Sequence, residues 1–531
     1  MSNSVLRRAA HVGAMTGISR VAGLVREQLM AYVFGTGLAK SAFDVAFRIP
    51  NLFRRLFGEG ALSAAFIPVY TEVREREGPA VANELAQRVA GLLIAVLSLI
   101  TALGILAALV LQQYLPDGSR WSAILPLLRI MLPYAPLICL AALTMGILNA
   151  LRHFTIPALA PVFLNLVWIV ALAGICPFMP PDPFLRIRVV AWAVLVAGVI
   201  QVAVQLPVLA RYGVPLRPRF QWRGDARIRR ILMLMGPMAL GAGLVQINVC
   251  IDGFLAMWSA KWAPSALEYA ERLVYLPLGL VGNAFATVLL PTLSSQATQR
   301  DYSGLGATLG RALRNIIVIM APVAVGLTLL ALPITSLVYQ LGDGAFQDES
   351  ALQTARALAG YAPGLLVFSL YKAITPAFYA LQDTCTPVRV SIFAIVFNLL
   401  LNILSVILLP EGWKHVGIAS STVLTSLLNC ATLLIILHKR TGALRASGLT
   451  RTLAAALAAA VLMGVMVVHL NNALMAALTP RLHLKLAQIL AIGITVAAGA
   501  AAYGLLMALF CRQALDELLE DFRQRKTRKR G

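Results

Sequence analysis

Two neighbouring stretches decide the fold: SRVAGLVREQLMAYVFGTG at Ser19–Gly37 and AFDVAFRIPNLFRRLFGEGALSAAFIPVY at Ala42–Tyr70. Both are long apolar runs of bilayer-spanning length, yet both contain arginines and carboxylates. The rest of the chain is equally apolar, because 59% of its 531 residues are hydrophobic, only 13% are charged, and the mean hydropathy is +0.79. Soluble domains carry about 25% charged residues. The composition therefore excludes a soluble enzyme and predicts an all-α polytopic membrane protein.

About fourteen segments have the roughly 20 mostly apolar residues that a transmembrane helix needs. These predicted spans lie near residues 12–34, 41–69, 84–112, 125–150, 156–178, 188–210, 231–258, 266–292, 312–340, 353–380, 387–409, 415–437, 449–471 and 484–511. Six scattered cysteines without a CxxC motif argue against a disulfide framework or a zinc site.

Basic residues concentrate in alternate connections, among them residues 211–230 and the tail Arg523–Arg530. The connection at 342–349 contains no lysine or arginine. The positive-inside rule therefore predicts that both termini lie in the cytoplasm. The net charge of +22 is then explained by cytoplasmic loops and anionic lipid headgroups. A nucleic-acid partner is not expected, since no aromatic residue interleaves the basic tail.

An internal duplication is predicted from matching segments. Ala46–Ile49 (AFRI) is echoed by Ala270–Leu273 (AERL), and Tyr134–Pro136 (YAP) recurs at Tyr361–Pro363, with offsets of 224 and 227 residues. Repeats of this kind are typical of transporters whose substrate site lies at the repeat interface near the bilayer midplane. The chain is accordingly divided into an N-lobe (1–212, helices 1–6), a basic and amphipathic cytoplasmic linker (213–230), a C-lobe (231–440, helices 7–12), helices 13–14 (441–512) and a basic cytoplasmic tail (513–531). The two six-helix lobes are expected to be related by pseudo-two-fold symmetry.

Charged residues inside these spans are the candidate site, because each costs about 2.5–3.5 kcal/mol at a helix centre. Those that we expect to line water, to pair or to face a ligand are Arg20, Arg26, Glu27, Asp44, Arg48, Arg54, Arg55, Glu268, Glu271, Arg272 and Lys372. Helical spacing groups Asn51 with Arg54 and Arg55, and Ser265 with Glu268 and Arg272. The carboxylates are expected to hold the arginines in place. Snorkelling remains open for Arg54 and Arg55, as does simple structural pairing for Lys372.

The excess of arginine points to an anionic ligand with oxygen acceptors. Guanidinium groups are planar, permanently charged and bidentate, which suits phosphate oxygens. Several of them around one midplane cavity favour a large anion such as a pyrophosphate. Pro50 interrupts the second predicted span just before Arg54 and Arg55, as in the broken helices that transporters use around substrates.

The two quoted stretches, with AERLVYLPLGLVGNAFATVLLPTLS at Ala270–Ser294 and the segment Tyr361–Pro387, closely resemble the MurJ/MviN family of lipid II flippases. The resemblance covers essentially the whole chain, and PNLFRRLFGEGA is its most specific segment. Glu27 and Glu271 stand where aspartate is commoner in the family, and Ser41 occupies a place that is often acidic.

The resemblance implies a member of the multidrug/oligosaccharidyl-lipid/polysaccharide exporter superfamily, with two six-helix lobes and two further C-terminal helices that form a groove for a polyprenyl tail. It implies transport of undecaprenyl-pyrophosphate-linked disaccharide pentapeptide (lipid II) across the bacterial inner membrane, with membrane lipids and cell-wall synthesis proteins as further candidate partners. The family's substrate-binding positions fall on Arg20, Arg26, Arg54, Arg272, Asn51 and Ser265.

The expected mechanism is alternating access without enzymatic chemistry or a cofactor. No nucleotide-binding motif such as GxxxxGK[ST] occurs in the sequence, so the membrane potential or an ion is the candidate driving force. Three alternatives stay open at this point: a flippase for another undecaprenyl-pyrophosphate-linked glycan, a membrane enzyme acting on polyprenyl phosphates, and a scaffold that does not transport.

Overall fold

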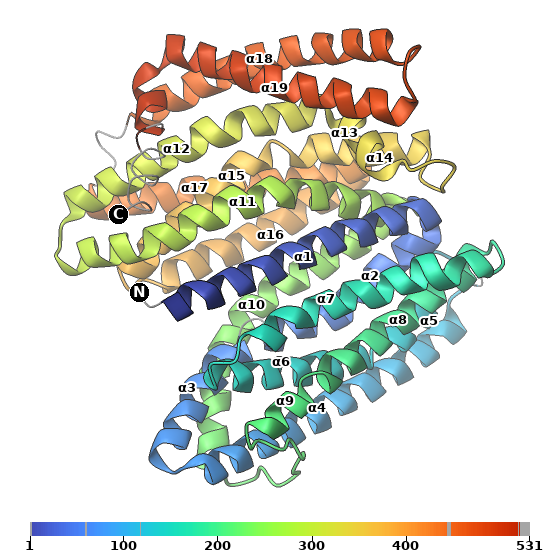
Figure 1. The fold of residues 1–531 in the computed structure, drawn as a ribbon, viewed down its shortest axis with the longest axis vertical. Helices are drawn as coiled ribbons and strands as arrows, with labels where there is room; N and C mark the ends of the chain where they lie inside the picture. The colour runs from blue at the N-terminus through green and yellow to red at the C-terminus, as the bar shows by residue number, and fades with distance from the viewer. Residues whose placement is uncertain (1–2, 59–60, 117, 443–447, 519, 521–531) are drawn as a thin grey trace. The chain divides into compact units, whose positions relative to one another are not determined.

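The computed structural model describes residues 3–58, 61–116, 118–442, 448–518 and 520, and within these ranges the chain is helical and contains no strand (Figure 1). The predicted all-α class is therefore confirmed. The basic residues 523–530 and Arg445, which entered the orientation argument, lie outside the described residues.

The helices of the first half are α1 (Asn3–Phe34), α2 (Leu38–Phe53), the π-helical turn η1 (Arg54–Gly58), α3 (Ala61–Arg76), α4 (Pro79–Tyr114), α5 (Ile124–Met131), α6 (Tyr134–Ala150), α7 (Thr155–Ile169), η2 (Val170–Ile175), η3 (Cys176–Phe178), α8 (Pro183–Ala203), α9 (Leu206–Arg211) and α10 (Ala226–Ser259). Those of the second half are α11 (Ala263–Thr298), α12 (Tyr302–Leu329), α13 (Ala331–Tyr339), α14 (Asp348–Tyr361), α15 (Gly364–Ala380), α16 (Cys385–Leu408), α17 (Lys414–Thr441), α18 (Leu449–Leu478) and α19 (Leu484–Phe510).

Aspartates begin several of these helices by capping free backbone N–H groups. The side chain of Asp182 accepts from Phe184 N at 2.8 Å before α8, and that of Asp301 accepts from Gly304 N at 2.8 Å before α12. Helix α17 ends at Gly442, whose φ of +63° is the left-handed conformation that glycine adopts without strain.

Ten of the described helical segments are long and apolar enough to cross a membrane, or eleven if the bent pair α14–α15 forms one span. The chain is therefore a multi-pass membrane protein. This count does not reach the predicted number of about fourteen spans. Helices α1, α2, α3 and α10 are not among the ten, and α1 and α2 carry five of the candidate charges.

The chain folds into two compact units, one made of residues 1–265 and 342–346, the other of residues 266–341 and 347–531. The core of the first unit includes Phe43, Tyr134 and Trp168, which are almost fully buried. This division differs from the predicted lobes at one helix, because α10 packs against α2 and α3 in the first unit. The lobe boundaries and their symmetry stay predictions from the sequence repeat.

The second predicted span, residues 41–69, is broken into α2, η1 and α3. Pro50 lies inside α2 and cannot donate a backbone hydrogen bond, and the α-helical pattern gives way to a π-helical turn at Arg54. The predicted interruption is therefore present, and it places Arg54 and Arg55 on irregular backbone.

The basic connection 213–225 runs without helix across α4, and the amphipathic character of the linker stays a prediction from the sequence. Pro215 and Pro218 within it disfavour a helix. Its backbone is held by Gln87 of α4, since the side-chain Nε2 of Gln87 donates to Pro215 O at 2.8 Å, and Arg219 N donates to the backbone O of Gln87 at 3.0 Å. We call this segment, residues 213–225, the strap.

Ion pairs connect the strap and the start of α10 to α3 and α4. Arg219 pairs with Glu84 at 3.0 Å, and Arg227 pairs with Glu77 at 2.9 Å. Partial burial raises the pKa of Asp225, but the backbone and side chain of Arg227 and the side chain of Arg88 donate to it and hold that pKa below its ordinary value. These ion pairs all lie within the first unit.

Candidate functional site

Arg26 is the most deeply buried candidate cation, with 8% of its surface exposed. It lies in α1, where Nη2 pairs with Glu27 Oε1 at 2.5 Å and Nη1 donates to Asn165 Oδ1 of α7 at 2.9 Å. The guanidinium stacks over Trp168, 4.5 Å from the ring centroid, while Nε has no hydrogen-bond partner among the described residues. Asn165 is itself fixed, since its Nδ2 donates to Ser19 O at 3.0 Å. Both terminal nitrogens of the fork are therefore occupied by protein groups in this structure.

Arg20 lies one and a half turns before Arg26 in α1 and is exposed. Asp44 of α2 is nearly buried and accepts two hydrogen bonds from Lys40 Nζ, at 2.5 and 2.7 Å. Lys40 is only 1% exposed and was not among the candidates. Lys40 could have been identified from the sequence, because it precedes Asp44 by four residues and residues at that spacing lie on the same face of a helix.

Ser265 is fully buried at the start of α11. Its Oγ shares a hydrogen bond of 2.8 Å with Ser41 Oγ and also donates to Trp262 O at 3.0 Å. Ser265 therefore serves a packing contact in this structure, and its direct role in binding stays a prediction.

Three arginines at or near the broken end of α2 donate hydrogen bonds. Two of them donate to α10 and one donates to α2 itself. Arg48 Nη1 donates to Val249 O at 2.6 Å, Arg55 Nη1 donates to Gln246 Oε1 at 3.2 Å, and Arg54 Nε donates to Asn51 Oδ1 at 2.8 Å. The predicted grouping of Asn51 with Arg54 is present, but Arg55 turns to α10. Arg48 fits because residue 253 is glycine: a Cβ there would lie 2.7 Å from Nη1.

The second unit holds the remaining candidates on α11 and α15. Arg272 Nη2 pairs with Glu268 Oε1 at 2.8 Å, and 46% of the arginine side chain is exposed. Lys372 Nζ donates to Asn283 Oδ1 at 2.6 Å, an amide that the sequence reasoning missed. Glu271 is half-buried on the same helix as Arg272. Glu27 and Glu268 thus hold arginines, as expected of the carboxylates.

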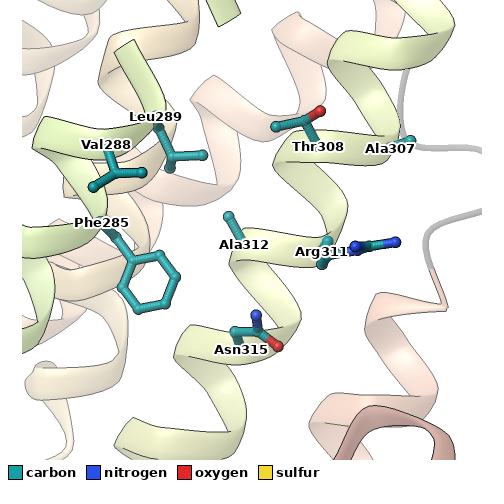
Figure 2. A pocket seen from close by; sticks show the side chains of 8 residues that line it. All are labelled: Phe285, Val288, Leu289, Ala307, Thr308, Arg311, Ala312 and Asn315. Carbon is teal, nitrogen blue, oxygen red and sulfur yellow. The ribbon is translucent and has the colours of Figure 1, made fainter. Parts of the chain in front are cut away.

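A cavity of about 350 Å³ lies between α11 and α12 in the second unit. Figure 2 shows Phe285, Val288 and Leu289 on α11, with Ala312 of α12 facing them. The side chain of Arg311, also on α12, points away from α11. The cavity is mainly apolar on its α11 side and polar at Asn315 and Thr308, and none of the predicted site residues lines it.

The chemistry available at these positions is that of fixed cations. Within the described residues no group of three or more His, Cys, Asp or Glu side chains could hold a metal ion. All six cysteines are free thiols. Arginine forks, a lysine and amides can bind phosphate or carboxylate oxygens by charge-assisted hydrogen bonds.

Comparison with known proteins identifies close relatives. The family described as "Lipid II flippase MurJ" matches residues 30–519. A "Probable lipid II flippase MurJ" of Rhizobium tropici is 36% identical over 475 residues, covering 88% of this chain and 87% of that protein. A "Lipid II flippase MurJ" of Burkholderia cenocepacia is 34% identical over 446 residues, covering 82% of this chain and 84% of that protein.

Solved structures share the fold. A lipid II flippase MurJ in an inward closed conformation matches with a TM-score of 0.73 at 22% identity, covering 94% of this chain and 98% of that one. An inward-facing multidrug resistance MATE family transporter of the MOP superfamily matches with a TM-score of 0.66 at 15% identity, covering 82% of this chain and 99% of that one.

Proposed function

The chain belongs to the MurJ lipid II flippase family, which matches it over residues 30–519, and from this membership we propose that it moves lipid II from the cytoplasmic to the periplasmic leaflet. The membrane is then the bacterial inner membrane, with both termini in the cytoplasm, as the positive-inside rule favours. The protein acts as a transporter and not as an enzyme, and it requires no cofactor.

The observation that carries this proposal is the set of arginines on helices that are otherwise apolar. Arg26 is buried in α1, Arg54 lies on the broken end of α2, and Arg272 is half-exposed on α11. Such charges are costly in a membrane and mark substrate pathways. We assign Arg20, Arg26, Arg54 and Arg272, with Asn51 and Ser265, to binding of the pyrophosphate–sugar headgroup.

The contacts of Arg26 suggest how the headgroup is bound and released. In this structure Glu27 neutralises the guanidinium and Asn165 fixes its orientation. A pyrophosphate oxygen is a stronger competitor for the fork than an amide, because it carries charge and matches the bidentate geometry. Substrate binding therefore replaces protein contacts of Arg26, and release restores them.

Transport proceeds by alternating access of the N-lobe and C-lobe, in the division at residues 213–230 that the repeat predicts. The polyprenyl tail stays in lipid or in a groove of α18 and α19. The membrane potential acts on charged groups at about 2.3 kcal/mol per charge per 100 mV and is a sufficient source of energy to reset a net-positive site. An ion is the other candidate for coupling, and cell-wall synthesis proteins are candidate partners.

Reconstitution of the purified protein into liposomes tests the proposal. Lipid II is placed in one leaflet, and its appearance in the other is measured by accessibility to an added enzyme or label. We expect protein-dependent translocation of chemically unchanged lipid II, faster than that of an undecaprenyl-pyrophosphate carrying an unrelated glycan. Absence of translocation, preference for the unrelated glycan, or a chemically altered lipid would each contradict it.

A further inference from the structure

A basic cavity lies within the second unit where the hairpin of α18 and α19 meets α12, as the packing of these helices shows (Figure 1, red and yellow). Its volume is about 450 Å³. The lining residues that matter here are Arg314 of α12, Arg451 and Thr452 in the first turn of α18, Phe510 at the end of α19, and Arg512 and Glu517 just beyond it.

The lining carries an uncompensated positive charge. Glu517 is already taken, since its Oε2 accepts from Arg314 Nη2 at 2.7 Å and from Nε at 3.0 Å. Among the described residues, Arg512 has only a loose pair with Asp516, at 3.6 Å between largely exposed side chains. Arg451 has neither an ion pair nor a side-chain hydrogen bond within the described part of the chain. Two guanidiniums are thus available to a ligand.

The start of α18 adds to this preference for an anion. Gly448 precedes the helix with a φ of +58°, and as a glycine it has no side chain with which to cap the first turn. The N–H groups of that turn and the helix dipole therefore favour a negative group at this end. Thr452, which also lines the cavity, is 2% exposed. The positive charge of the lining, the dipole of α18 and the volume of the cavity therefore coincide at the N-terminal end of α18.

The cavity also has an apolar wall at a helix end, which distinguishes a lipid from a free anion. Leu509 and Phe510 line it, and both side chains are exposed to the surroundings of α19, at 78% and 42%. The ends of α18 and α19 at this cavity are the ends that the positive-inside rule assigns to the cytoplasm. Basic pockets between transmembrane helices on that side bind lipid headgroups.

We propose that this cavity binds the phosphodiester of an anionic phospholipid of the cytoplasmic leaflet, with Arg451 and Arg512 contacting the phosphate and Leu509 and Phe510 contacting the acyl chains. The site is separate from the predicted headgroup residues and does not depend on the transport proposal. Its ligand is a resident lipid that fixes the C-terminal hairpin against α12.

Native mass spectrometry of the full-length protein tests the site by titration with phosphatidylglycerol and with phosphatidylcholine. We expect wild type to bind phosphatidylglycerol more tightly, and the affinity to fall by about fivefold for each arginine removed in Arg451→Gln and Arg451→Gln/Arg512→Gln. Arg481→Gln is the matched control, because Arg481 is exposed at the opposite end of the same hairpin. It should bind phosphatidylglycerol as wild type does.

Two further measurements separate the outcomes. The Tm without added lipid should be the same for wild type and Arg451→Gln, since Arg451 has no ion pair or side-chain hydrogen bond among the described residues, so lost binding in that variant is not lost folding. Inorganic phosphate at millimolar concentration should leave the bound phosphatidylglycerol in place, and displacement would assign the site to a free anion instead. Equal binding of both lipids, or unchanged affinity in the double variant, would also overturn the proposal.

Discussion

Arg26 shows how a guanidinium is accommodated inside a membrane protein. Its charge is balanced by Glu27, its orientation is set by Asn165, and its face lies on the Trp168 ring. Each partner removes part of the cost of burial, because a buried charge is tolerated only when it is paired and hydrogen-bonded. The cluster is therefore a coupled unit of the first lobe's core.

Removal of Glu27 should expose this coupling. In Glu27→Ala the buried guanidinium loses its counter-charge, and we expect a loss of about 3 kcal/mol of unfolding free energy. The double variant Arg26→Met/Glu27→Ala removes both charges and should recover most of that loss. Chemical denaturation in detergent measures both. A double variant as unstable as Glu27→Ala would contradict the coupling.

The pKa of Asp383, in the connection between α15 and α16, leads to a prediction of how the protein's stability depends on pH. Hydrogen bonds from the side chain and backbone of Thr386, with Arg440 as an ion-pair partner, lower its pKa to about 2. A lowered pKa in the folded state means that the stabilisation is complete above about pH 4. It is lost as the pH falls to about 2.

We expect Asp383→Asn to lower the Tm at pH 7 by about 2–4 °C. The difference between wild type and variant should shrink between about pH 4 and pH 2 and then vanish. Thermal melts of wild type and variant across this pH range test whether the difference in Tm shrinks or grows on acidification. A difference that grows on acidification would show that the carboxylate is not stabilised in the folded state.

Short spacings in the sequence were enough to predict some contacts of the candidate residues. Glu268 and Arg272 are four residues apart, and Asn51 and Arg54 are three apart, and both pairs form. The contacts of Arg26 with Asn165 and of Arg55 with Gln246 join residues more than 100 positions apart. Helical periodicity carries no information on such contacts, which depend on how the helices pack.

At the scale of elements, Pro50 correctly predicted an interrupted second span. It removes one backbone N–H inside α2, and the α-helical pattern gives way to a π-helical turn four residues later, at Arg54. The basic connection after α9 contains Pro215 and Pro218, which disfavour a helix, and the strap is non-helical. Arg219 of the strap pairs with Glu84 of α4.

The strap depends on a close approach to α4 at Gly91. A Cβ at residue 91 would lie 2.0 Å from Arg219 O, a backbone atom that can yield only if the strap moves. We therefore expect Gly91→Ala to cost about 1–3 kcal/mol and to increase proteolysis within residues 213–225. Gly504→Ala in α19 is the control, since nothing lies within 4 Å of a Cβ there. Unchanged stability and proteolysis in Gly91→Ala would refute the close contact.

For the whole molecule, the alternation of basic and cation-poor connections predicted the orientation. We expect a cysteine at Asp343 to react with an impermeant thiol reagent from the periplasm, and a cysteine at Arg223 to react only from the cytoplasm. Both variants should be made with Cys385→Ser, because Cys385 is exposed. Labelling from the reverse sides would invert the topology.

Composition was sufficient to predict the class of the fold, because a chain with so few charges has no other way to bury its apolar surface. The number of spans was harder to settle, because ten or eleven of the described helices qualify by length and composition, α1, α2, α3 and α10 are not among them, and α2 ends in a π-helical turn. In α1 and α2, charges such as Arg26 and Asp44 lower the hydropathy, so a rule for lipid-facing helices does not describe them.

The most direct test of the central claim is the initial rate of lipid II translocation in proteoliposomes for wild type, Arg26→Ala, Arg272→Ala and the control Arg481→Ala. Both site variants should fall at least about tenfold while the control keeps the wild-type rate, since each loses a charge-assisted contact to the headgroup. Wild-type rates in both Arg26→Ala and Arg272→Ala would contradict the role of these arginines in transport.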